Sequence, residues 1–194
     1  IRSIKESKKF TKKMNKILLL VLFLPFLSFA QLNRIGKVSQ SIDAAKSISG
    51  EFESFEIFNQ ETKSASENYS DAVKDGVVVA IDQSKINEIR NQDPKQMQLS
   101  IPFKSNGETV ALDLIQVAVF SPDFKAITNN GIDITNEVDF GKHYRGIIAG
   151  NPNSLVSISV FESQISGFIS DEEGNYTIGK LGDSDNDHII YHDL

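Results

Sequence analysis

The sequence of 194 residues lacks cysteine and tryptophan altogether. Without cysteine the chain can form neither disulfides nor catalytic thiolates nor cysteine-ligated zinc, so its apolar core has to hold the fold. Basic residues are scarce beyond the N-terminus: the first sixteen residues carry seven Lys or Arg and one Glu, so the net charge of −6 leaves −12 on the rest of the chain. Nucleic acids bind clustered Lys and Arg, so this acidic remainder argues against a nucleic-acid partner.

The apolar segment from Ile17 to Phe29 has the pattern of a secretory signal peptide. It follows the basic start Met14-Asn15-Lys16, and it is shorter than the roughly 20 apolar residues that a membrane-spanning helix needs. The small residues Ser28 and Ala30 predict cleavage between Ala30 and Gln31. We therefore expect the rest of the chain to be secreted and to keep no stable membrane anchor. An uncleaved anchor or a buried helix is the alternative.

The sequence divides into four segments. Residues 1–13 precede a methionine suited to initiation, and we interpret them as translated upstream or other non-native sequence; residues 14–30 are the predicted signal peptide. Residues 31–50 are polar with scattered Ile and Val, which predicts a short N-terminal arm. Residues 51–194 predict one folded, β-rich domain, and the abrupt end at Leu194 predicts truncation of a longer protein.

A β-meander is predicted between Gly141 and Tyr176. Apolar residues at 156, 158 and 160 alternate with other residues, which is the pattern of a strand with one buried face. Turns are predicted at residues 151–154 and 173–175, because proline fixes φ and because Gly and Asn tolerate positive φ. Five residues are expected to pack in the core of this meander: Tyr144, Val156, Ile158, Val160 and Phe168.

Further short apolar runs alternate with turn residues, a spacing typical of an all-β sandwich or barrel. The Asn-Gly pair at 106–107 predicts a hairpin between Gln98–Phe103 and Glu108–Ile115. Residues 117–120 are expected to continue that run into a turn at Ser121-Pro122-Asp123, and Asn129-Asn130-Gly131 predicts another tight turn. The other predicted strands are Phe52–Phe58, Gly76–Ile81, Tyr176–Leu181 and His188–His192.

One short helix and one loop complete the predicted fold. Ser84 is expected to cap a helix that carries Ile86 and Ile89 on one face and ends before Asp93-Pro94, because a residue that precedes proline disfavours the α conformation. Residues 59–70 lack apolar anchors and are expected to form a loop. We therefore predict an all-β fold, mainly an antiparallel β-sandwich or meander with one short helix, preceded by a signal peptide.

Histidine patterns in the chain do not complete a catalytic or zinc site. His188 and His192 have the spacing of the zinc motif H-E-x-x-H, but Ile189 replaces its glutamate. The residues between them favour a strand, in which positions four apart lie about 13 Å from each other, too far to share one zinc ion. The tripeptide His143-Tyr144-Arg145 is expected to lie in a strand, where consecutive side chains point to opposite faces and cannot converge.

Two shorter patterns are also weak indications, one of a calcium site and one of glycosylation. Asp183, Asp185 and Asp187 match the first positions of a calcium loop, but the glycine and the final glutamate of such a loop are missing. A solvated acidic turn is the simpler interpretation, with weak calcium binding as the alternative. Asn68-Tyr69-Ser70 and Asn175-Tyr176-Thr177 match the glycosylation sequon, which is short enough to occur by chance.

A longer set of motifs spans the last third of the chain: GKHYRG at 141–146, GNPNS at 150–154, a strand pair at 159–168, NY at 175–176 and HIIY at 188–191. Together these motifs resemble the propeptide of reprolysin-type zinc metalloproteases, which are metzincins. Residues 98–124 are similar to the preceding propeptide hairpin more loosely, and the leader is similar to leaders of secreted Bacteroidetes proteins. The residues that define the core of the motif are Tyr144, Gly146, Ser154, Ser159, Gly167, Tyr176 and Tyr191.

This resemblance implies that the chain is the N-terminal part of a secreted zinc metalloendopeptidase precursor, with the catalytic domain beyond Leu194. The fragment would be non-catalytic and would bind no metal or cofactor of its own, whereas the absent catalytic domain would bind zinc. It would assist the folding of its own downstream protease domain and cover the cleft of that domain until removed. Because the chain has no cysteine, inhibition by a zinc-ligating cysteine cannot operate, and inhibition must be steric.

Two other classes of function remain to be compared with a propeptide. The alternative is a free-standing secreted β-sandwich that binds a surface glycan or protein. A hydrolase complete in itself would need a nucleophile, a base and an orienting acid in one constellation, and the sequence offers no such set.

Overall fold

The computed structural model describes residues 36–64, 73–102, 108–182, 184 and 186–193, which belong to one compact unit. The predicted signal peptide, its cleavage site at Ala30 and Gln31, and residues 1–13 lie outside the described residues. The described elements in chain order are α2 (Lys37–Ser49), β1 (Ser54–Glu56), β2 (Phe58–Ser64), β3 (Lys74–Ile81), α4 (Gln83–Gln92), β4 (Gln96–Pro102), β5 (Thr109–Gln116), β6 (Lys142–Ile148), β7 (Leu155–Val160), β8 (Ile165–Ser170), β9 (Asn175–Lys180) and β10 (Asp187–Asp193).

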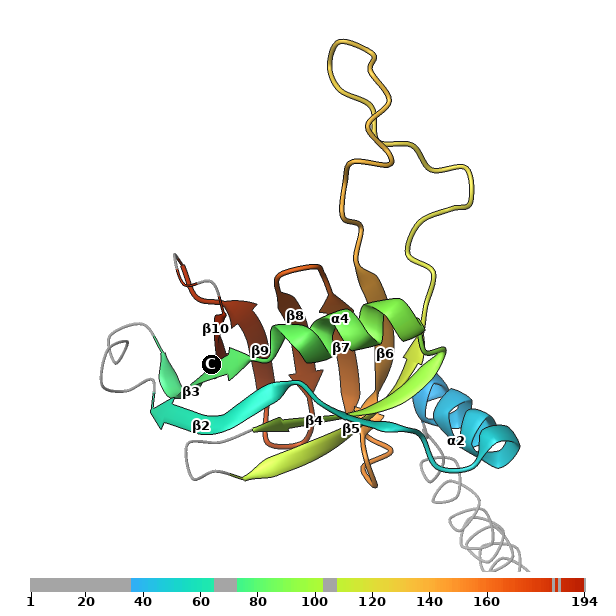
Figure 1. Cartoon of the computed structure of the whole chain (residues 1–194). Helices are drawn as coiled ribbons and strands as arrows, with labels where there is room; N and C mark the ends of the chain where they lie inside the picture. Colours follow the sequence, from blue (N-terminus) through green and yellow to red (C-terminus); the bar gives the residue numbers. More distant parts are fainter. Residues whose placement is uncertain (1–35, 65–72, 103–107, 183, 185, 194) are drawn as a thin grey trace, which may run out of the picture. The chain divides into compact units, whose positions relative to one another are not determined.

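The strands form a single curled sheet in the order β1-β4-β5-β6-β7-β8-β9-β10-β3-β2 (Figure 1). Neighbouring strands are antiparallel except β1 and β4, which are parallel. Strands β1 and β2 stand at opposite ends of this order, yet only the buried Ile57 separates them in the chain. The two ends of the sheet therefore have to meet, and the sheet curls into a nearly closed barrel.

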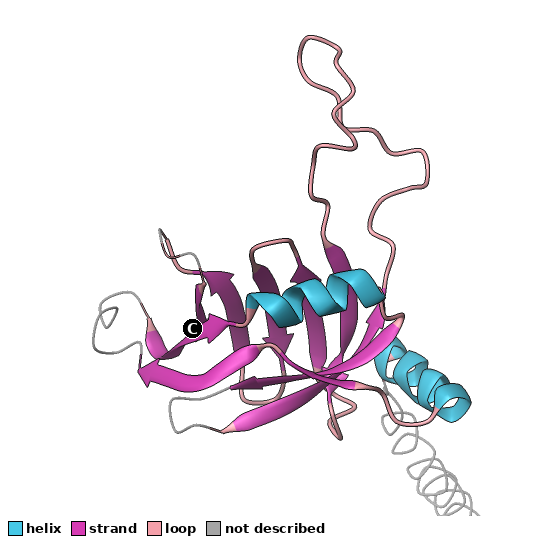
Figure 2. Cartoon of the chain, viewed as in Figure 1, coloured by secondary structure: helices cyan, strands magenta, loops and turns pink. Residues whose placement is uncertain are grey.

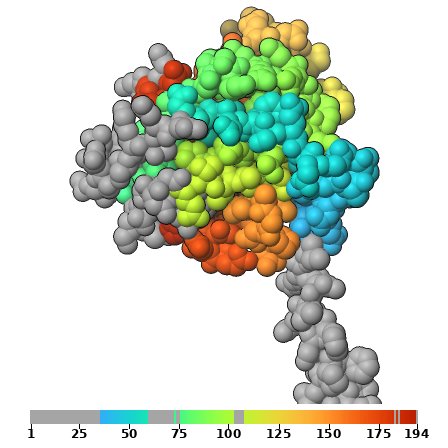
Figure 3. All heavy atoms as spheres, turned by 60° about the horizontal axis from the view of Figure 1, so that its bottom comes forward, coloured from blue at the N-terminus to red at the C-terminus, as the bar shows by residue number. Residues whose placement is uncertain are grey.

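The space-filling view shows the closure from outside (Figure 3). The cyan segment before residue 60 lies beside the yellow-green strands β4 and β5, and β2 contacts β4. The strand order and pairing confirm the predicted all-β, mainly antiparallel fold with its meander. One curled sheet, in place of the two packed sheets of a sandwich, surrounds the core.

The core of the meander follows the predicted alternation with one exception. Tyr144, Val156, Ile158 and Val160 are each at most 1% exposed, as predicted. The prediction for Phe168 is wrong, because this side chain is 38% exposed. Strand β8 turns Ile165 and Ile169 inward, so Phe168 points to the opposite face, and the inward position between the two isoleucines is a glycine.

Helix α4 closes over the barrel core (Figure 2). Ile86 and Ile89, which were predicted to share one face of this helix, are both fully buried. The cap is Asp82 and not Ser84: the Asp82 carboxylate accepts hydrogen bonds from the backbone amides of Ser84 and Lys85. The prediction for the N-cap was therefore two residues late, because aspartate and serine are both good caps and both stand at this boundary.

Helix α2 was not predicted from the sequence, which suggested only a polar arm. Its buried Ile42 packs with Phe52 and Ile147 on the outer face of the sheet. The Lys46 ammonium group lies 2.9 Å from the carboxylate of Asp113, which is 3% exposed, and Gln98 donates a further hydrogen bond to Asp113. These contacts stabilise a helix that has too few apolar residues to form alone.

Strand β2 replaces part of the loop that was predicted at residues 59–70. Residues 58–64 pair with β3 in antiparallel register, although their side chains are mostly polar. Pairing with a strongly apolar neighbour therefore overrides a weak local pattern. No helix among the described residues is long and apolar enough to cross a membrane.

Candidate functional site

The residues of the propeptide-like motif lie on different strands and perform structural tasks. Ser154 is buried, its hydroxyl donates to the Asn151 carbonyl at 2.7 Å, and it accepts from the amide of Ile148 at 2.7 Å. This serine therefore fixes the turn between β6 and β7. Tyr176 is 6% exposed on β9, and its ring lies edge-on to His192.

The two motif glycines mark close approaches between strands. A Cβ atom at Gly146 would lie 1.8 Å from the backbone oxygen of Asp113 on β5. A Cβ atom at Gly167 would lie 2.6 Å from the Cδ1 atom of Ile158 on β7. The last motif residue, Tyr191, is half-buried on β10. The motif therefore describes how the barrel packs, and it does not bring its residues together as a chemical site.

The tripeptide His143-Tyr144-Arg145 diverges, as predicted. Tyr144 points into the core, whereas His143 faces the other side and bonds to Ser159 on β7. The His143 Nε2 atom lies 2.8 Å from the Phe140 carbonyl oxygen, so it carries the proton and donates, and Nδ1 accepts from the Ser159 hydroxyl at 2.9 Å. No carboxylate bonds to this ring among the described residues, so the Ser–His contact lacks the acid of a catalytic triad.

His188 and His192 lie on strand β10, as predicted, in different surroundings. His188 is fully buried; its Nδ1 donates to the Asn186 carbonyl at 2.9 Å, and its Nε2 accepts from the Ile165 amide at 3.1 Å. His192 is only half-buried. Asp183 and Asp185 of the acidic turn lie outside the described residues, as does the sequon at Asn68. Within the described ranges, no three His, Asp or Glu side chains form a group that could hold a metal ion.

The buried His188 makes stability depend on pH. Burial, aided by the charge of Lys180, lowers the pKa of His188 below its ordinary value of 6.5. The unfolded chain therefore takes up a proton near pH 6.5 before the native protein does, so the free energy of unfolding should fall as the pH drops below 6.5, by up to about 1.4 kcal/mol per pH unit. The loss of stability ends once the pH falls below the lowered pKa of His188 in the folded protein.

Denaturant unfolding at pH 7.5 and pH 5.5 measures this effect. The His188→Gln variant is the control, because the glutamine side chain has a carbonyl that can accept from the Ile165 amide but does not titrate. We expect the variant to lose less stability than the wild type between the two pH values. Equal losses would show that His188 does not carry the pH dependence.

A long segment between two strands, residues 117–141, lies outside the barrel wall, and we call it the projection. It leaves β5 and returns to β6, and Figure 1 shows it reaching away from the strands. The prediction that residues 117–120 continue the strand is wrong, because β5 ends at Gln116. The predicted turns are present: the Phe124 amide donates to the Ser121 carbonyl, and the Gly131 amide donates to the Thr128 carbonyl.

Hydrogen bonds within the projection give it a defined shape. Ile127 and Asp133 form an antiparallel bridge, and the Thr128 amide donates to the Ile132 carbonyl at 2.9 Å. Gly131 has φ of 82°, which a tight turn at this point requires. The Asp133 carboxylate accepts from the Thr135 amide and hydroxyl and lies 3.2 Å from Lys125, and these contacts lower its pKa to about 2.

The C-terminal end of the projection is fastened to the barrel by Asp139. This carboxylate accepts from the amides of Gly141 and Glu162 and lies 3.0 Å from the Arg90 guanidinium on α4. Although burial opposes it, this set of hydrogen bonds lowers the pKa of Asp139. Aromatic rings from both ends of the projection and from β6 also pack against one another: Phe120, Phe124, Phe140 and His143.

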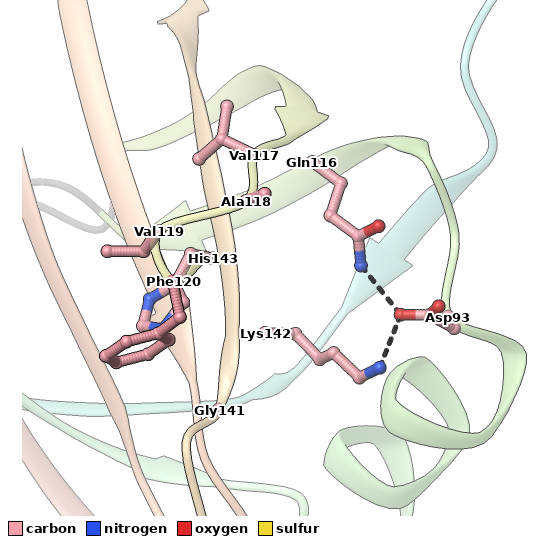
Figure 4. Close-up of a pocket in the computed structure, with 9 residues that line it drawn as sticks. All are labelled: Asp93, Gln116, Val117, Ala118, Val119, Phe120, Gly141, Lys142 and His143. Carbon is pink, nitrogen blue, oxygen red and sulfur yellow. Dashed lines mark hydrogen bonds and ion pairs between the residues drawn. The ribbon is translucent and has the colours of Figure 1, made fainter. Parts of the chain in front are cut away.

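A shallow hollow of about 270 Å³ lies at the foot of the projection. Figure 4 shows Gln116 and Lys142 converging on Asp93, while Phe120 and His143 line the other side. The Asp93 carboxylate lies 2.8 Å from Lys142 and 2.8 Å from Lys95 and accepts from Gln116, so these cationic and amide groups lower its pKa. The single carboxylate among the residues that line the hollow is therefore already paired with two ammonium groups, and the lining offers no unpaired carboxylate to a cation.

The hydroxyl of Tyr144 lies near this network but remains unsatisfied. It is buried and makes no hydrogen bond of acceptable geometry, although the Gln116 side chain approaches it. Burial, together with the charge of Asp93, raises the pKa of Tyr144 to about 12. A neutral phenol of this kind is a core residue and not a general base.

Exposed apolar side chains distinguish the projection from the barrel. Of the nine large apolar side chains exposed among the described residues, six belong to the projection. Turn residues in the sequence indicate its bends, but a run without strand periodicity does not predict which apolar residues face solvent. The six are Val119, Phe120, Phe124, Ile127, Ile132 and Val138.

No protein-family profile, curated protein sequence or solved structure matches this chain.

Proposed function

We propose that residues 31–194 are the propeptide of a secreted zinc metalloendopeptidase precursor. The propeptide assists the folding of the downstream protease domain and covers the cleft of that domain until it is removed. The observation that carries this proposal on the structural side is the concentration of exposed apolar side chains on the projection. Exposed apolar surface gathered on one segment marks a place where a protein, a membrane or a ligand binds, and we propose that a protein binds here.

The resemblance of residues 141–191 to reprolysin-type propeptides supports a protease as that other protein. The motif residues pack the barrel, which is the task expected of a non-catalytic scaffold. The protease domain would contribute the zinc ion and its ligands. Because the chain lacks cysteine, its contribution to silencing the enzyme is to fill or cover the cleft.

The alternative is a free-standing secreted module that binds a surface protein or glycan. It is favoured by a second pair of exposed apolar residues, Leu155 and Phe168, which lie on the neighbouring strands β7 and β8. This pair offers a contact surface separate from the projection.

Reading the gene beyond the codon for Leu194 separates the two proposals. The propeptide proposal predicts an open reading frame that continues into a domain with the motif H-E-x-x-H-x-x-G-x-x-H. A stop codon directly after Leu194 would favour the free-standing module. A reading frame that continues into a different domain would contradict the proposal that the chain is a protease propeptide. The barrel would then be a module of another kind of protein.

A further inference from the structure

We propose that the tip of the projection, residues 126–134, occupies the substrate-binding cleft of the protease domain; this inference rests on the proposed function. Ile127 and Ile132 flank the tip turn and are 59% and 60% exposed. Two large aliphatic side chains so exposed on a narrow turn bury substantial area only when a concave surface receives them. A protease cleft is such a surface.

The tip is organised before it meets a partner. The Ile134 amide donates to the Ala126 carbonyl, and the Ala126 amide donates to the Thr135 hydroxyl. At the other end, Asp139 ties the projection to α4 and to the β7–β8 turn. A segment that is already ordered loses little conformational entropy on binding, so more of the buried apolar area contributes to affinity.

Internal hydrogen bonds also suit the tip to block a protease without being a good substrate. Proteins that bind extended peptides hydrogen-bond to the free main chain of the peptide, as an added strand. In the tip, the amides of Thr128, Gly131 and Ile134 already donate to carbonyls of the projection itself. The tip can therefore insert its isoleucines while withholding part of the main chain that a cleavable peptide would offer.

The net charge of the projection limits the kind of cleft that its tip can enter. The projection carries Asp123, Asp133, Glu137 and Asp139 against Lys125, a net charge of −3. A complementary cleft has an apolar floor and a neutral or basic rim. The same charge disfavours an anionic lipid surface, to which apolar residues on an acidic segment would be held only weakly.

Inhibition and binding assays with matched variants test the proposal. Residues 31–194 are added to the purified protease domain of the same precursor, and both the inhibition constant and the Kd are measured. The tip variant combines Ile127→Asp with Ile132→Asp, and the control combines Leu155→Asp with Phe168→Asp on the barrel wall. We expect the tip variant to weaken both constants by about tenfold or more, as for central interface residues, and the control to change them by less than about threefold.

The outcomes separate the inference from the function on which it rests. Thermal unfolding verifies first that both variants fold like the wild type. If the tip variant binds and inhibits as well as the wild type, the tip does not enter the cleft, and the same conclusion follows if a small active-site inhibitor fails to compete with the wild type. If the wild type neither binds nor inhibits, the proposal that the propeptide covers the cleft is itself wrong, whichever segment is involved. If light scattering shows wild-type dimers that the tip variant loses, the tip contacts a second copy of this chain instead.

Discussion

The Gly146→Ala variant is expected to lose about 3 kcal/mol or more of its free energy of unfolding, because a small-to-large change in a packed site costs this much when its neighbours cannot move. The added Cβ atom would lie 1.8 Å from the backbone oxygen and 2.8 Å from the carbonyl carbon of Asp113. Both atoms belong to β5, the strand paired with β6. Relief would therefore require the two strands to separate.

A second glycine within a strand provides the matched control. Gly179 lies on β9, and a Cβ atom there would meet no other atom within 4 Å. Gly179→Ala should be neutral or stabilise the protein by up to about 1 kcal/mol, since alanine restricts the unfolded chain. Urea denaturation measures both changes. Equal stability of the two variants would mean that β5 and β6 do not approach as closely as the structure has them.

The Ile158→Ala variant is expected to lose about 2–5 kcal/mol, the usual range for removing a large aliphatic side chain from a core. Ile158 is fully buried in the centre of β7, between Tyr144 on β6 and Gly167 on β8. Its Cδ1 atom fills the space above Gly167, so truncation leaves a cavity that the glycine cannot fill.

Phe168→Ala is the control for Ile158→Ala, because Phe168 is the larger side chain but is 38% exposed. We expect it to cost less than about 1 kcal/mol, as for most surface substitutions. Denaturant midpoints of the two variants give the comparison directly. A larger loss for Phe168→Ala than for Ile158→Ala would reverse the assignment of the inner and outer faces of the meander.

Local patterns account for the parts of the fold that the sequence predicts well. The meander and the β4–β5 hairpin join neighbouring segments, and their apolar residues alternate with a period of two. Phe168 shows the limit of such reasoning. Its hydrophobicity suggested the core, whereas the position of Ile165 and Ile169 in the same strand decides which face it occupies.

Long-range pairing accounts for what the sequence did not predict. Strand β10 lies between β9 and β3, and β2 is stabilised by β3, although no local signal specifies these partners. Helix α2 likewise depends on Ile147 and Asp113, which are far along the chain. A period of 3.6 through Val38, Ile42 and Ala45 was the available signal for this helix, but its neighbours are polar.

The candidate site was the least predictable part, because its defining property is exposure and not periodicity. The turns at residues 121–124 and 128–131 could be identified from proline, asparagine and glycine. The role of Asp139 could not, because its partners Arg90 and Glu162 come from other elements. Nor could the sequence alone show that Ile127 and Ile132 remain exposed.

The proposal that this barrel silences a protease is tested most directly by the activity of that protease. The purified catalytic domain is assayed on a peptide substrate with and without an equimolar amount of residues 31–194, and its recovery from denaturant is measured in parallel. We predict lower activity or a higher yield of refolded enzyme when the wild-type chain is present. Unchanged activity together with an unchanged refolding yield would contradict the account.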